Sequence, residues 1–271
     1  MTPYEMFKFK YSINSALAIR PAVKKGRANW GDGFPWIAKF LDVFFPEIVP
    51  QVTFLGWLQD IYLQVLLRNE RPDLELNPGQ VLIVAGEPGR GKTLLSSVIV
   101  SRLLGGHSDI SAYFVGQESF CGSFAEKNLV TVDDVVPTTT RLRRKQYSDM
   151  VKKLTAGGPH AKKHVGQFIW NGRVFVTCNV DPESLQILPV LDASMADKVI
   201  VLRCNSEPKF PLKFPKYATL SNRIHRELPF FGRFLDKWDI PKTVKGQGPR
   251  FPVRGFPVGA YQDPTLLYAM K

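Results

Sequence analysis

The sequence predicts an α/β protein built on a mainly parallel, doubly wound sheet. Short apolar runs typical of buried strands recur along the chain and alternate with stretches of helical periodicity. Several of these runs end in glycine, aspartate or asparagine. The carboxyl ends of parallel strands are where such a sheet carries its ligand-binding residues, so the two observations agree.

The clearest strand is 81–85, Val-Leu-Ile-Val-Ala, because an unbroken apolar run is typical of a strand buried on both faces. The residues after it fit G-x-x-x-x-G-K-[ST] at every position. They are Gly86, Glu87, Pro88, Gly89, Arg90, Gly91, Lys92 and Thr93. An apolar-periodic helix follows and stops at 105–106, so the motif has the strand-to-helix context of a phosphate-binding loop, which a chance glycine-rich turn would lack.

The chemistry of this loop fits a nucleoside triphosphate, with ATP and Mg²⁺ as the expected cofactors. Its glycines let the backbone turn tightly and aim N–H groups at a phosphate, and the following helix adds the positive end of its dipole. Lys92 is expected to reach the β- and γ-phosphates, and the Thr93 hydroxyl to bind Mg²⁺.

A second apolar run, 128–134, ends in Asp133 and Asp134. Paired acids at a strand end match a Walker B element, in which one carboxylate organises Mg²⁺ through its water and the other polarises the attacking water. Surface turns also favour Asp pairs, so the assignment depends on the register with the phosphate loop. The run 173–179 predicts another strand, and its Asn179 is placed to sense the γ-phosphate. Residues 111–115 and 198–202 are the remaining strand candidates.

The composition favours a globular protein with a polyanionic partner. The 271 residues include 36 Lys plus Arg against 24 Asp plus Glu, which gives a net charge of +12. A generically basic protein is the alternative. The cysteines, Cys121, Cys178 and Cys204, form no C-x-x-C pair, so we expect free thiols and no zinc site. No apolar run is long enough to cross a bilayer, and the start is not a signal peptide, so the expected location is the cytoplasm of a bacterial or virus-infected cell, without a membrane partner.

Four segments are predicted: a basic and aromatic N-terminal segment (1–35), a helical lead-in (36–78), the P-loop ATPase core (79–205) and a C-terminal helical and loop extension (206–271). The first mixes lysines and arginines with aromatics and many breakers. Such a segment either contacts single-stranded nucleic acid by base stacking or packs its aromatics on a neighbouring domain. Apolar residues at helical spacing fill 36–45, 52–67 and 220–238.

A basic, helix-like stretch over 141–154 leads into a turn that carries Lys162, Lys163 and His164. From composition alone, this basic segment is interpreted as a positively charged surface exposed to solvent. In order along the chain, however, Walker A, Walker B, this cationic segment and the strand ending in Asn179 resemble a superfamily 3 helicase, the compact AAA+-related motor of viral and phage replication. The helicase part of phage and plasmid primase–helicases is the most similar type. The resemblance is specific over 81–204 and loose elsewhere.

This resemblance implies a ring, six-membered by the family pattern, that hydrolyses ATP between subunits and moves single-stranded or forked DNA. It also implies that Lys163 and His164, with Lys162 beside them, sit on a β-hairpin in the central channel. No primase module is recognisable, so either the protein works alone or a separate primase or polymerase is its partner. The family places an arginine finger before the strand that corresponds to 199–202, where this chain has Lys198. Lysine lacks the planar guanidinium fork, so either Lys198 substitutes or Arg203 takes the role.

The sequence therefore leaves three hypotheses for the function. The first is an ATP-driven DNA helicase or translocase. The second is a replication-initiation or loader factor that binds ATP and recruits a partner without unwinding, which the lysine at position 198 favours. The third is an RNA helicase.

Overall fold

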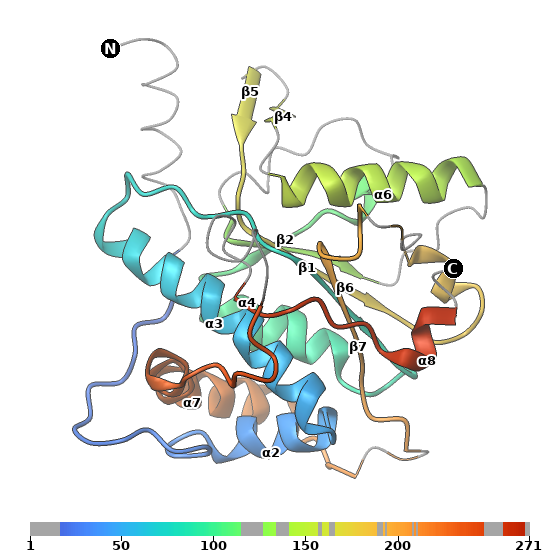
Figure 1. Ribbon diagram of the computed structural model, residues 1–271. Coiled ribbons are helices and arrows are strands. Elements are labelled where there is room, and N and C mark those ends of the chain that lie inside the picture. Colours follow the sequence, from blue (N-terminus) through green and yellow to red (C-terminus); the bar gives the residue numbers. More distant parts are fainter. Residues whose placement is uncertain are drawn as a thin grey trace.

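The computed structural model describes residues 17–114, 127–133, 141–156, 159–162, 166–188, 192, 194–207, 209, 211–246 and 257–268. Within these ranges a five-stranded sheet forms the centre of the molecule (Figure 1). Its strands are β1 (Val81–Ala85), β2 (His107–Asp109), β3 (Leu129–Asp133), β6 (Arg173–Cys178) and β7 (Val199–Arg203). They lie in the order β2-β3-β6-β1-β7, and every pair is parallel, as predicted.

Helices cover both faces of the sheet, because successive side chains of each strand point to opposite faces. In β1, Leu82 and Val84 pack into one hydrophobic cluster, and Val81, Ile83 and Ala85 pack into the other. The first cluster includes α2 (Pro35–Phe44), α3 (Ile48–Glu70), α7 (Tyr217–Lys237) and the helix after the phosphate loop. The second includes α5 (Ser111–Phe114) and α6 (Arg141–Thr155), and Figure 1 shows α6 on the side of the sheet away from α2 and α7.

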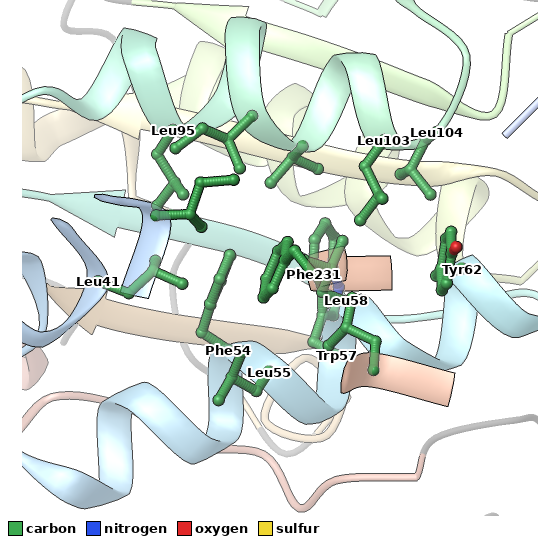
Figure 2. Close-up of a cluster of buried hydrophobic side chains, with 14 of the residues drawn as sticks. Leu41, Phe54, Leu55, Trp57, Leu58, Tyr62, Leu95, Leu103, Leu104 and Phe231 are labelled. Carbon is green, nitrogen blue, oxygen red and sulfur yellow. The ribbon is translucent and has the colours of Figure 1, made fainter. Parts of the chain in front are cut away.

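The core between α3, α7 and the sheet is built from large apolar side chains (Figure 2). Phe54 and Leu58 of α3 face Leu95 and Leu103 of the helix after the phosphate loop, and Phe231 of α7 lies between them. That helix comprises a π-helical stretch, η1 (Leu94–Val100), and α4 (Ser101–Leu103), and it ends before two glycines with positive φ, as predicted. The lead-in helices therefore share one hydrophobic core with the face of the sheet to which Leu82 and Val84 point.

One strand prediction is wrong. Residues 111–114 form the short helix α5, and the strand at that edge of the sheet is the polar segment His107–Asp109. The Asp109 carboxylate accepts hydrogen bonds from the Ser111 amide at 2.8 Å and from the Ser111 hydroxyl, so it caps a helical turn where a strand was expected. Phe114 closes that turn by donating its N–H to the carbonyl of Ile110 at 2.8 Å.

The remaining elements are a two-stranded antiparallel sheet, β4 (Pro159–Lys162) and β5 (Gly166–Ile169), the 3₁₀ turn η3 (Ser184–Ile187) and α8 (Pro264–Leu267). Tyr261 and Asp263 hydrogen-bond to the Val201 backbone, so the C-terminal segment lies along the free edge of β7. Between 17 and 34 the aromatics pack: Trp30 lies edge-on to Phe234 at 5.2 Å, and Phe34 contacts Phe231 at 5.3 Å. The other aromatics of segment 1–35, together with Lys8 and Lys10, lie outside the described residues.

No helix in the described ranges combines the length and the apolar character needed to span a membrane. Cys178 and Cys204 are buried free thiols, as expected, and Cys121 lies outside the described residues.

Candidate nucleotide site

The predicted site residues converge because their strands are parallel and in register. Ala85 of β1 pairs with Cys178 of β6, and Asp133 of β3 pairs with Thr177 of β6. The phosphate loop begins directly after Ala85, and Asn179 directly follows Cys178. The loop, the Asp133 carboxylate and the Asn179 amide therefore share the carboxyl edge of the sheet, where α/β proteins bind ligands.

The phosphate loop has little room for any residue but glycine at two positions. A Cβ on Gly86 would lie 1.9 Å from the Cys204 sulfur, which packs against the loop from the end of β7. Gly91 has φ +90°, and a Cβ there would lie 3.1 Å from the ring of Phe40. The loop is thus held closely between β7 and α2, with its intervening residues Glu87, Pro88 and Gly89 exposed.

Lys92 is positioned before any nucleotide arrives. Its side chain is buried, and its ammonium donates to the carbonyls of Gly86 at 2.7 Å and Glu87 at 3.0 Å and to Asn179 Oδ1 at 2.8 Å. The last of these bonds joins the phosphate loop to the end of β6. Nucleotide phosphate oxygens at the loop would compete with these acceptors for hydrogen bonds from the same ammonium group, so nucleotide binding would weaken the bond to Asn179.

Thr93 and Asp133 form the part of the site that could hold Mg²⁺. The Thr93 hydroxyl donates to Asp133 Oδ2 at 3.3 Å, and the Thr177 hydroxyl donates to Asp133 Oδ1. Hydroxyl and carboxylate oxygens are the ligand types that Mg²⁺ takes in nucleotide sites, with waters and phosphates completing the shell. The described residues hold no cluster of three or more His, Cys, Asp or Glu side chains that would bind a metal alone. The oxygen donors therefore fit a nucleotide-bound Mg²⁺ ion.

Thr177 was not predicted as a site residue. Its side chain is buried, it lies on β6 two positions before Asn179, and it hydrogen-bonds to one oxygen of the Asp133 carboxylate. The only signal in the sequence is a hydroxyl residue near the end of the strand, and its meaning depends on the pairing of β6 with β3. Thr177 thus orients the Asp133 carboxylate and would act on a bound Mg²⁺ ion only through it, as a positioning residue.

Thr177→Val is expected to raise the Mg²⁺ concentration for half-maximal ATP hydrolysis about 10–100-fold, as is usual when an outer-shell partner of a metal-binding carboxylate is removed. Valine keeps the shape of threonine and removes only the hydroxyl that orients Asp133. The measurement is a Mg²⁺ titration of hydrolysis at saturating ATP.

Thr131→Val is the matched control for this prediction. Thr131 is also buried and lies on β3 two residues before Asp133, but among the described residues the Asp133 carboxylate accepts hydrogen bonds from the Thr93 and Thr177 hydroxyls and not from Thr131. The same Mg²⁺ dependence in both variants would contradict a positioning role for Thr177.

Two further buried side chains, Cys204 and Arg90, belong to the surroundings of the phosphate loop. Burial raises the pKa of the Cys204 thiol to about 11, although Lys92 and Arg90 lower it, so the group that touches Gly86 stays uncharged. A neutral thiol does not repel a phosphate in the loop. Arg90 is buried, and its Nε has no hydrogen-bond partner within the described part of the chain.

The two candidates for the finger residue, Lys198 and Arg203, lie at opposite ends of β7. Lys198 precedes β7, only 9% of its surface is exposed, and its ammonium donates to the Ser194 carbonyl and to Asp197 Oδ1 at 3.3 Å. A five-residue strand is about 16 Å long, so Lys198 cannot reach the phosphate loop of its own subunit. Arg203 ends β7 at the loop edge and donates to the Thr265 hydroxyl at 2.9 Å.

The hairpin that the resemblance implies is present. β4 and β5 pair antiparallel between α6 and β6, and Figure 1 shows them projecting away from the main sheet. Three residues, 170–172, connect β5 to β6, the strand that directly precedes Asn179. Lys162 is the last residue of β4, and its side chain is not among those described. Lys163, His164 and the second Walker B carboxylate, Asp134, lie outside the described residues.

No protein-family model matches the sequence, and no curated protein matches it. Several solved structures are similar in fold. The A-form apo structure of the NrS-1 C-terminal region superposes with a TM-score of 0.61 at 13% identity, over 93% of this chain and 52% of that one. A second apo structure of the NrS-1 C-terminal region gives 0.58 at 16% identity, over 83% and 49%. The chain thus spans about half the length of each, and the likeness concerns the fold alone.

Proposed function

We propose that the chain is an ATP-dependent DNA helicase or translocase of the superfamily 3 type, acting in phage, plasmid or viral replication. The observation that carries this proposal is the hydrogen bond of 2.8 Å between Lys92 of the phosphate loop and Asn179. It joins the nucleotide site to the strand that follows the cationic hairpin. A motor needs such a link, because nucleotide state must alter the element that grips the nucleic acid.

In this proposal the loop from Gly86 to Thr93 holds the phosphates of ATP, and Thr93 and Asp133 hold Mg²⁺, which neutralises charge on the phosphates. Asp134 polarises the attacking water. When phosphate oxygens accept the hydrogen bonds of the Lys92 ammonium, Asn179 loses its bond to Lys92 and turns to the γ-phosphate. The carboxyl end of β6 responds to that exchange, and the hairpin at its amino end carries the response to a DNA strand through Lys162, Lys163 and His164.

The active form in this proposal is a ring, with six subunits as the expected number and ATP bound at the contacts between them. Lys198 then contacts the γ-phosphate of a neighbouring subunit, after its hydrogen bonds to Ser194 and Asp197 break. Alternatively, Arg203 makes this contact after its hydrogen bond to Thr265 breaks. A separate primase or polymerase is the expected partner at the replication fork.

The test is ATP hydrolysis with and without single-stranded DNA, with Lys92→Ala as the blank. Stimulation by DNA that the blank lacks, together with unwinding of a forked duplex, is the expected result. The same assay with DNA and RNA duplexes distinguishes a DNA from an RNA helicase. Absence of hydrolysis under all conditions would contradict the motor.

A second candidate is an ATP-binding initiation or loader factor without unwinding activity. The observation that favours it is the state of Lys198, whose ammonium is buried and hydrogen-bonded within its own subunit. If neither Lys198 nor Arg203 reaches a neighbouring γ-phosphate, hydrolysis is slow and ATP acts as a switch. Tight ATP binding without DNA-responsive turnover would support this alternative.

A further inference from the structure

One face of α7 is polar, basic and uncovered. Thr219, Asn222, Arg223 and Arg226 are all exposed and follow i, i+3, i+4, i+7 spacing, so they form one stripe along the helix. We call these four residues the α7 arginine face. The opposite side of the helix is buried in the core through Leu220, Ile224, Leu228 and Phe231.

The α7 arginine face borders a hollow of about 400 Å³, with Glu227 at its end. Glu227 does not serve as a partner for the arginines by hydrogen bonding, because its carboxylate accepts the backbone N–H groups of Trp36 at 3.0 Å and Ile37 at 2.8 Å. It caps the start of α2 instead. The hollow therefore presents guanidinium, amide and hydroxyl donors beside one carboxylate, which is hydrogen-bonded to the start of α2.

Glu227 is the one acidic residue among those that line the hollow, and Arg223 interacts with it electrostatically. Neither Arg223 nor Arg226 forms an ion pair with any residue of the described ranges, and the first turn of α7 contains no acidic residue. Lys213 and Lys216 precede the helix and are exposed. The partial positive charge of the helix N-terminus adds to the same field. An anion placed here would meet attraction from several directions.

We propose that the α7 arginine face binds the sugar–phosphate backbone of single-stranded DNA, as a contact separate from the hairpin. Guanidinium groups match phosphate oxygens two at a time, and side-chain amides and hydroxyls are common phosphate and sugar donors. From residue 219 to residue 226 the helix rises about 10 Å at 1.5 Å per residue, which accommodates more than one phosphate of a strand. The inference rests on the proposed function, in which DNA is the substrate.

The test compares binding of a fluorescent oligothymidylate to the wild type and to Arg223→Ala/Arg226→Ala over a range of salt concentrations. Each phosphate contact to a single strand contributes about 0.7 to the slope of log K against log salt, so losing two contacts should reduce the slope by about 1.4. That change corresponds to about 25-fold weaker binding at 0.1 M salt. Arg223→Lys/Arg226→Lys should keep most of the slope, since it keeps the charge.

The matched control is Lys237→Ala/Lys242→Ala, which removes two exposed cations at and beyond the other end of α7. An equal loss of slope in this control would overturn the proposal, because net charge alone would then explain the effect. So would an arginine variant that binds DNA like the wild type but binds ADP more weakly, since the face would then serve the bound nucleotide. A wild type that binds DNA through this face without hydrolysing ATP would support the inference and contradict the motor.

Discussion

Lys92→Ala is expected to lower ATP hydrolysis by about 10²–10³-fold, the usual loss when one preorganised charge at a reacting group is removed. The Lys92 ammonium is already fixed by three oxygen acceptors at 2.7–3.0 Å, so it meets a phosphate with little reorganisation. The measurement is steady-state hydrolysis at saturating ATP and DNA.

The same substitution should also lower the free energy of unfolding without nucleotide, by about 1–3 kcal/mol, because the acceptor groups on Gly86, Glu87 and Asn179 lose a charged donor. The control is Lys39→Ala, which removes an exposed lysine from α2. Hydrolysis within a few-fold of wild type in Lys92→Ala would refute the assignment of the phosphate loop. A melting curve checks that the variant is folded.

The sequence predicted the centre of the sheet well because burial there leaves a strong pattern. β1, β3, β6 and β7 are apolar on both faces, and their observed bounds lie within a residue or two of the apolar runs. β2 was missed because His107–Asp109 is a polar, three-residue edge strand, whose pairing with β3 is a tertiary effect. The apolar residues that follow it were mistaken for the strand, since Asp109 caps a helix through its side chain.

Some residues of the candidate site could likewise be predicted from local sequence, whereas others depend on tertiary contacts. Lys92, Thr93, Asp133 and Asn179 could be named because each belongs to a motif with a fixed spacing from a strand end. Thr177 could not, since its role depends on which strands are neighbours. The burial of Lys198 also depends on the turn at 194–198, because its ammonium donates to the Ser194 carbonyl, and the sequence does not predict that backbone contact. Asp134, Lys163 and His164 stay predictions.

Asp60→Ala is expected to lower the free energy of unfolding by about 3–5 kcal/mol, the range for breaking a buried ion pair by removing one partner. Asp60 of α3 pairs with Arg173, the first residue of β6, whose side chain is 1% exposed. Arg173 also donates to the Asn77 carbonyl at 2.9 Å. The variant would leave a buried guanidinium without its counter-charge. Chemical denaturation of the nucleotide-free protein measures the effect.

Asp73→Ala provides the comparison, because Asp73 pairs with Arg71 at 3.8 Å on the surface, where the two side chains are 75% and 66% exposed. Its loss should cost about 0–1 kcal/mol. Arg173 is the first residue of β6, and Asn179 directly follows the last, so Asp60 anchors the amino end of β6 while Lys92 binds just beyond its carboxyl end. If β6 carries a signal between nucleotide and hairpin, Asp60→Ala should weaken the stimulation of hydrolysis by DNA more than it weakens hydrolysis without DNA. An equal effect on both rates would mean that the ion pair supports stability alone.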